Sequence, residues 1–251
     1  MNKICYLHLG FHKTASTSFQ FTCSRNRELL SSFGITYPIF NCLAAKKLLS
    51  NNHQLLIYPL YCKNPKSYRA FIRWNLIDQM EEVINSYRQQ LEECLEKSNN
   101  IILSGEDISL LDKDNLEKLV EKIKSYDYKV YIFALVRSPY NFCCSIIQQH
   151  IKSGKYRNLI SLNDLLPTHL NVNINACTRS KVVEKLKSTF QENIQFYSFE
   201  DASKHNYGPV GFLIEKQLLI DPSLFAYTFK CLCTSLLCIC VSRHVHVCVA
   251  L

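Results

Sequence analysis

Residues 3–18, KICYLHLGFHKTASTS, decide the fold of this chain. Residues 4–9 form a short apolar run that predicts a buried strand, and residues 18–31 have the spacing of a helix. Between them lies a turn of small, basic and hydroxylated residues. Strand, loop and helix in this order predict a place where backbone N–H groups and the positive end of a helix converge on an anion.

The rest of the chain repeats this alternation of strands and helices. The apolar segment 130–136, VYIFALV, has the near-continuous hydrophobicity of a parallel strand that is covered on both faces. We therefore predict an α/β fold, a three-layer open parallel sheet with helices on both faces and ligands at the carboxyl ends of its strands. Further strands are expected at 35–37, 101–103 and 194–199, and helices at 68–97, from 112 onward, 140–152, 181–190 and 208–219.

Composition favours one globular domain, residues 1–228, followed by an atypical tail, residues 229–251. The chain is 47% hydrophobic and carries a formal charge of +8, which favours anionic ligands, although a solvated basic surface is the plain alternative. Cys5, Cys94, Cys143 and Cys144 lie in predicted strands and helices, where a reduced thiol behaves as a small apolar side chain, so we expect a cytoplasmic protein. The N-terminal apolar stretch is too short for an export signal.

The tail contains five of the thirteen cysteines. Its uninterrupted apolar core of about ten residues is shorter than the roughly 20 residues of a membrane-spanning helix, so no transmembrane span is expected. Its Cys-x-Cys spacing is not the common zinc pattern, so no metal is expected either. Palmitoylation and an alternative C-terminus that impairs the enzyme both remain open.

Three groups of residues are candidates for a functional site. The turn provides a cation and hydroxyls for an anion, although a Ser- and Thr-rich helix N-terminus is the structural alternative. Arg137 ends the strand at 130–136, and Ser145 lies two helical turns beyond it, where both can reach one phosphate. Glu106 follows the strand at 101–103 and is a candidate base. The candidate residues of the turn are His12, Lys13, Thr14, Ala15, Ser16, Thr17 and Ser18.

The segment HKTASTS at 12–18 resembles the phosphosulfate loop of sulfotransferases that use 3′-phosphoadenosine 5′-phosphosulfate (PAPS), which often reads HKTGTTS. The resemblance covers residues 3–219 and implies a fold like that of P-loop nucleoside triphosphate hydrolases. It implies that the turn holds the phosphosulfate, with Lys13 supporting the leaving phosphate, and that Arg137 and Ser145 hold the 3′-phosphate. Ala15 replaces the usual glycine. If the loop needs a positive φ there, alanine costs roughly 1 kcal/mol.

The resemblance implies transfer of a sulfuryl group from PAPS to an acceptor hydroxyl, with Glu106 as the base and His8 and His12 as rivals for that role. A carbohydrate acceptor is favoured, phenols, lipids and small alcohols stay open, and no nucleic-acid partner is expected. Tyr68 and Trp74 are guesses for a sugar-stacking surface. The segment YSFED at 197–201 resembles a strand-end element of the family and is interpreted as structural.

Two alternatives come from other function classes. A P-loop kinase or NTPase would place Lys13 and Thr14 on ATP and use Glu106 and Asp107 as a magnesium-binding pair, but the turn lacks the glycine pattern GxxxxGK[ST]. A PAPS-binding protein that has lost turnover would keep the fold without the activity.

Overall fold

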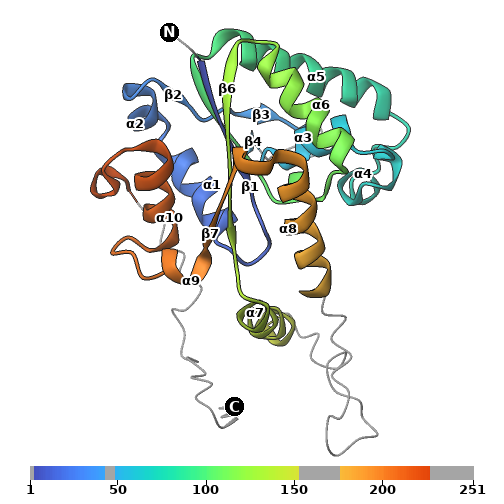
Figure 1. Ribbon diagram of the computed structural model, residues 1–251. Coiled ribbons are helices and arrows are strands. Elements are labelled where there is room, and N and C mark those ends of the chain that lie inside the picture. The colour runs from blue at the N-terminus through green and yellow to red at the C-terminus, as the bar shows by residue number, and fades with distance from the viewer. Residues whose placement is uncertain (1–2, 43–48, 153–175, 227–251) are drawn as a thin grey trace, which may run out of the picture.

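The computed structural model describes residues 3–42, 49–152 and 176–226, and these residues form an open five-stranded parallel sheet (Figure 1). The strand order is β2-β5-β1-β6-β7, so the strand that precedes the turn is central. The strands are β1 (Lys3–Leu9), β2 (Ile35–Thr36), β5 (Asn100–Gly105), β6 (Tyr128–Val136) and β7 (Ile194–Ser198), and β3 (Phe40–Asn41) pairs separately with β4 (Leu49–Ser50). The predicted α/β fold class is confirmed.

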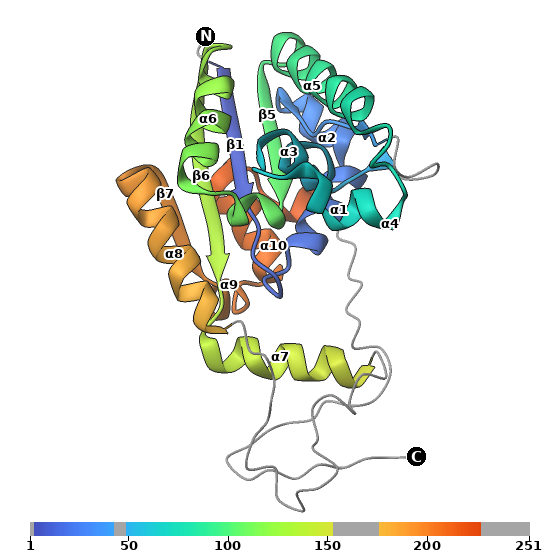
Figure 2. The same ribbon diagram turned by 90° about the vertical axis from the view of Figure 1, so that its right-hand side faces the viewer.

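Helices cover both faces of the sheet, as Figures 1 and 2 show from two directions. Helices α3, α5, α6 and α8 lie on one face, α1, α2 and α10 lie on the other, and α7 crosses the carboxyl ends of the strands. The helices are α1 (Ser16–Arg25), α2 (Arg27–Ser32), α3 (Gln54–Tyr61), α4 (Arg69–Arg73), α5 (Met80–Lys97), α6 (Lys113–Lys124), α7 (Pro139–Lys152), α8 (Ala176–Phe190), α9 (Phe199–Ala202) and α10 (Gly208–Leu213).

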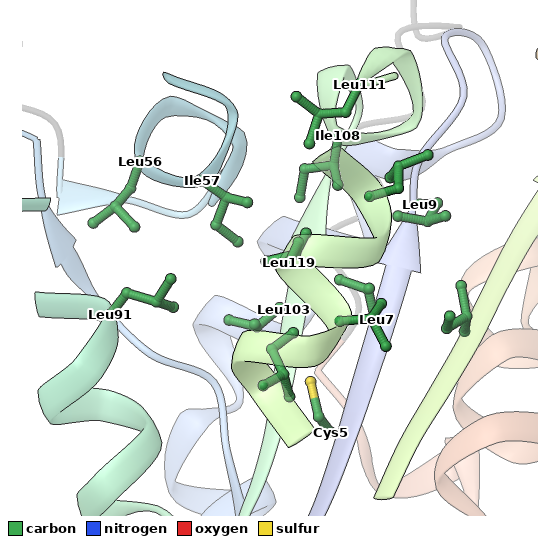
Figure 3. Packing of buried hydrophobic residues seen from close by; sticks show 14 of the residues in the cluster. Cys5, Leu7, Leu9, Leu56, Ile57, Leu91, Leu103, Ile108, Leu111 and Leu119 are labelled. Carbon is green, nitrogen blue, oxygen red and sulfur yellow. The ribbon is translucent and has the colours of Figure 1, made fainter. Parts of the chain in front are cut away.

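Alternate side chains of β1 enter two hydrophobic cores. Cys5, Leu7 and Leu9 pack with residues of α3, α5 and α6 in the first core (Figure 3). On the opposite face, His8 lies against Phe19 of α1. Because β1 is covered on both faces, its residues 4–9 form an almost continuous apolar run, in which His8 is the polar exception.

Two predicted helices are interrupted in the structure, so their predicted extents are wrong. The helix at 18–31 starts earlier, at Ser16, and breaks at Asn26, whose side-chain amide donates to the carbonyls of Thr22 and Ala226 at 2.8 and 3.0 Å. The helix at 68–97 breaks between α4 and α5, where Asn75 takes a left-handed backbone with φ of 53°. Apolar spacing alone does not reveal such tertiary and backbone preferences.

The predicted tail, residues 229–251, and the expected loop at 154–175 both lie outside the described residues. Within the part of the chain that is described, no helix is both long and apolar enough to cross a bilayer.

Candidate functional site

The candidate residues meet because β1, β5 and β6 are neighbouring parallel strands that end at one edge of the sheet. The turn follows β1, Glu106 follows β5, and Arg137 follows β6. The N–H of Gly10 donates to the carbonyl of Gly105 at 3.0 Å and joins the first two strand ends. This edge is where parallel α/β sheets bind their ligands.

The turn after β1 has an unusual backbone with two left-handed residues. Lys13 and Ala15 both take left-handed conformations, with φ of 66° and 60°, while Thr14 between them does not. Alternation of this kind turns successive N–H groups toward one side of the chain, next to the N-terminus of α1. The positive φ that the sequence analysis considered for Ala15 is present.

The hydroxyls of the turn divide into two groups. Those of Thr14 and Ser16 are buried and donate to the carbonyl of Phe11 at 2.6 and 3.1 Å. They brace the loop from within. Thr17 is exposed and Ser18 half-buried, in the first turn of α1.

Gly10 is required where the chain leaves β1. A Cβ at this position would lie 2.7 Å from Ser16 Oγ and 3.2 Å from Glu106 Cγ. The absence of a side chain therefore lets the loop turn directly beside Glu106.

Arg137 reaches the turn directly. Its Nη1 donates to the carbonyl of Lys13 at 3.1 Å, and its guanidinium lies over the ring of Phe199 at 4.7 Å. Its Nε is buried and has no hydrogen-bond partner among the described residues, which is unusual for a buried donor. Burial lowers the pKa of Arg137, while the carboxylate of Glu200 opposes that shift. The predicted convergence of Lys13 and Arg137 is present.

Lys13 adds a second cation to the same edge. Burial is the largest influence on its pKa and lowers it, the carboxylate of Glu106 acts in the opposite direction, and the charges of Arg137 and Lys152 lower it further. Because the charges of Arg137 and Lys152 disfavour the protonated form of Lys13, a bound anion would stabilise that form.

Glu106 and His12 form a pair beside these cations. Glu106 Oε2 lies 2.7 Å from His12 Nδ1, and Asp107 Oδ1 lies 3.9 Å from His12 Nε2. The backbone N–H groups of Glu106 and Asp107 both donate to Gln54 Oε1, at 2.8 and 2.9 Å, which holds the two carboxylates in place. Burial raises the pKa of Asp107. Glu106 and His12 therefore form one contacting pair rather than two separate groups.

Two other expectations about side chains are wrong. His8 is fully buried against Phe19 and Phe133 and cannot contact a substrate at the edge. Tyr68 belongs to the first core, packed against Tyr58, and is not exposed as a stacking surface. Trp74 also packs partly against that core. Ser145 lies on α7, the helix in which it was predicted, and is half-buried.

Glu200, whose segment is interpreted as structural from the sequence, also lies at this edge. Its carboxylate accepts from the backbone N–H of Ser138 at 3.1 Å and from Asn141 Nδ2 at 2.8 Å, at the start of α7. Partial burial raises its pKa, but the donors from Asn141, Ser138 and its own backbone together lower it to about 2. The sequence feature that could have pointed to Glu200 is its position, two residues after β7 at the carboxyl edge of the sheet.

A cavity of about 510 Å³ opens beside the turn, between α7 and α8. Its walls are largely apolar, and Arg179 of α8 enters it, which no sequence pattern indicated. Its lining residues include Phe11, Thr14, Arg137, Phe142, Arg179 and Val183.

No protein-family model matches this chain, and no curated protein matches it. Among solved structures, a chain from the PezAT toxin–antitoxin system of Streptococcus pneumoniae is 14% identical, with a TM-score of 0.39 over 85% of this chain and 78% of that chain. Shikimate kinase from Bacteroides thetaiotaomicron is 11% identical, with a TM-score of 0.39 over 86% of this chain and 99% of that one. Likeness at this level does not indicate a shared activity.

Proposed function

We propose that this protein is a sulfotransferase that binds PAPS across the turn and Arg137 and transfers its sulfuryl group to an acceptor hydroxyl. The observation that carries the proposal is the hydrogen bond of 3.1 Å from Arg137 to the carbonyl of Lys13. One nucleotide with anionic groups at both ends can contact both residues, because they share one edge of the sheet.

The two ends of the donor have different partners. The backbone of the turn and Lys13 hold the 5′-phosphosulfate, where oriented N–H groups and one cation neutralise it. Arg137, with Ser145, holds the 3′-phosphate, and the buried Nε of Arg137 supplies a donor that lacks a partner in the described chain. The 3′-phosphate distinguishes PAPS from ATP, so Arg137 is the residue that selects the donor.

The chemistry is an in-line displacement at sulfur. The acceptor oxygen attacks the sulfur, its proton passes to the Glu106–His12 pair, and the bond between the sulfur and the phosphate oxygen breaks. The bond pair leaves with 3′-phosphoadenosine 5′-phosphate (PAP). Lys13 and the loop amides stabilise the charge that develops on this phosphate.

A P-loop kinase or NTPase is the second candidate, and the adjacent carboxylates Glu106 and Asp107 beside Lys13 favour it. Two contacts oppose it. The imidazole of His12 lies against both carboxylates, which leaves them poorly arranged as a magnesium pair. The hydroxyl of Thr14 is committed to the carbonyl of Phe11, whereas a P-loop Ser or Thr contacts the metal.

Thermal unfolding with ligands separates the two candidates. PAP at about 100 times its dissociation constant is expected to stabilise the protein by about 2.7 kcal/mol, and ATP with magnesium is expected to do much less. Arg137→Ala should abolish the PAP effect, while Arg73→Ala, which removes an exposed arginine of α4, should leave it unchanged. Stabilisation by ATP with magnesium and none by PAP would reverse the assignment. PAP binding without transfer of labelled sulfate to any of a broad panel of hydroxyl acceptors would indicate a donor-binding protein without turnover.

A further inference from the structure

The cavity between α7 and α8 has the size and walls of a small-molecule site. Its volume of about 510 Å³ is within the range of ligand pockets. Val136, Pro139, Phe142 and Val183 provide apolar surface in its walls. Such walls suit an apolar ring, whereas each hydroxyl of a sugar placed against them would lose water without gaining a partner.

Arg179 gives the cavity a specific polar group. Its guanidinium lies 4.1 Å from the ring centre of Phe142 and 5.7 Å from that of Phe11. Its Nη1 donates to the carbonyl of His12 at 3.4 Å. Stacking on aromatic rings orients the plane of the guanidinium, and an oriented guanidinium can bind a carboxylate through two parallel hydrogen bonds.

The charges around the cavity favour an anion. Arg179 and Lys187 line it beside Arg137, which is assigned to the 3′-phosphate, and the acidic residue among its lining residues is Glu184. A ligand with one negative group therefore gains favourable electrostatic energy there.

The cavity also lies next to the proposed base. Arg179 contacts the backbone of His12, whose ring is paired with Glu106. The Glu106 carboxylate also acts electrostatically on Arg179. The cavity therefore borders the turn at Phe11 and Thr14, and Arg179 joins its wall to the backbone of His12.

We propose that this cavity is the acceptor site and that the acceptor is a small hydroxylated molecule with an apolar ring and a carboxylate, which Arg179 binds. This inference rests on the proposed sulfotransferase function. The carbohydrate acceptor favoured by the sequence is replaced by an amphipathic acid. Its hydroxyl oxygen forms the new bond to sulfur, its proton passes to the Glu106–His12 pair, and PAP leaves with the electrons of the broken bond.

Calorimetric titration of the full chain with saturating PAP tests the site without requiring turnover. PAP occupies the donor site, so the probes report on the cavity. The probes are 4-hydroxyphenylacetate and 4-ethylphenol, which share a phenol ring but differ in the carboxylate. We expect 4-hydroxyphenylacetate to bind at least about tenfold more tightly, as one charged hydrogen-bonded pair implies.

Three variants locate the binding. Arg179→Gln should remove the preference for the carboxylate, Val183→Trp should weaken both probes by filling the cavity, and Arg73→Gln is the matched control on an exposed arginine. Circular dichroism and thermal unfolding verify that each variant is folded. Equal affinity of the wild type for both probes, or unchanged carboxylate preference in Arg179→Gln, would overturn the proposal.

Two further outcomes separate this inference from the proposed function. If Val183→Trp abolishes PAP binding instead of probe binding, the cavity belongs to the donor and the inference is wrong. If the wild type binds no PAP, the sulfotransferase assignment fails, and titration of the same probes without PAP still determines whether the cavity takes an anionic ring compound. With both binding results in place, sulfation of 4-hydroxyphenylacetate but not of 4-ethylphenol would establish the acceptor role, and the reverse preference would refute it.

Discussion

His8 and His12 lie in the same segment of the chain, and each pairs with a residue in β5 or just after it. Their surroundings give the two histidines opposite properties. His8 Nδ1 lies 2.8 Å from Ser104 Oγ inside the molecule, and His12 Nδ1 lies 2.7 Å from Glu106 Oε2 at the carboxyl edge. Burial lowers the pKa of His8 to about 3, so it stays neutral, while the side chain of His12 is 49% exposed. Similar distances therefore belong to a neutral, packed histidine in one place and to a half-exposed histidine at the carboxyl edge in the other.

The largest effect is expected for the Glu106–His12 pair at the carboxyl edge of the sheet. Glu106→Gln keeps the shape of the side chain but removes its capacity to take a proton, so we expect kcat to fall about 10²–10⁴-fold with little change in the dissociation constant of PAP. Steady-state kinetics and calorimetry measure the two quantities. Glu121→Gln, at an exposed position of α6, is the control, and full activity of Glu106→Gln would assign the base elsewhere.

Substitution of His8, in the buried His8–Ser104 pair, should instead lower stability and leave kcat nearly unchanged. His8→Ala removes a ring packed against Phe19 and Phe133, and we expect the free energy of unfolding to fall by about 2–4 kcal/mol. Urea denaturation measures the loss. In the fraction that remains folded, kcat should be close to that of the wild type, and a loss of kcat at unchanged stability would contradict the division between the two histidines.

Stability should also depend on pH because of the buried histidines. His8 and His53 both have pKa values lowered to about 3 by burial, so the unfolded state binds protons that the folded state does not take up. The contribution of these two histidines to the free energy of unfolding is complete above their pKa in the unfolded state, near 6.5. It is lost as the pH falls toward 3. We expect a loss of about 2 kcal/mol per histidine between pH 7.5 and pH 5. Urea denaturation at both pH values measures it, and His8→Ala should show a smaller loss than the wild type.

Glu200 is expected to affect the edge site through Arg137. Glu200→Gln weakens the acceptor that holds Ser138 and Asn141 and removes a charge that favours the guanidinium. We expect the dissociation constant of PAP to rise about three- to tenfold, because the arginine is less firmly positioned. Calorimetry tests this, with Asp201→Asn, the neighbouring exposed carboxylate, as the control. If both variants raise the dissociation constant of PAP equally, Glu200 acts only through its charge and not by positioning Arg137.

The smallest effect is expected at Ala15, which directly precedes α1. Its φ of 60° is unfavourable for alanine, so Ala15→Gly should stabilise the protein by about 0.5–1 kcal/mol. Ala202→Gly in α9 should instead destabilise it, since Ala202 is buried in a helix. Urea denaturation measures both, and destabilisation by Ala15→Gly would mean that the loop tolerates alanine without strain.

Much of the fold and part of the site were predictable from the sequence. The strand at β6 and the pairing of the turn with Arg137 follow from apolar runs and from parallel strands that end at one edge. The break at Asn75 was not predictable, because the apolar spacing continues through it while the backbone does not. Arg179 was missed because it lies 167 residues from His12 in the chain, and no local pattern links them.

The sequence by itself determined the succession of strands and helices and the cation and hydroxyl groups of the turn, because periodicity and residue type are local properties. Tertiary structure alone decided which histidine faces the ligand edge, which aromatic residues are core, and which side chains line the cavity. Those outcomes depend on the order of strands in the sheet and on which helix packs over their ends. Such contacts between distant residues leave no periodic signal in the chain.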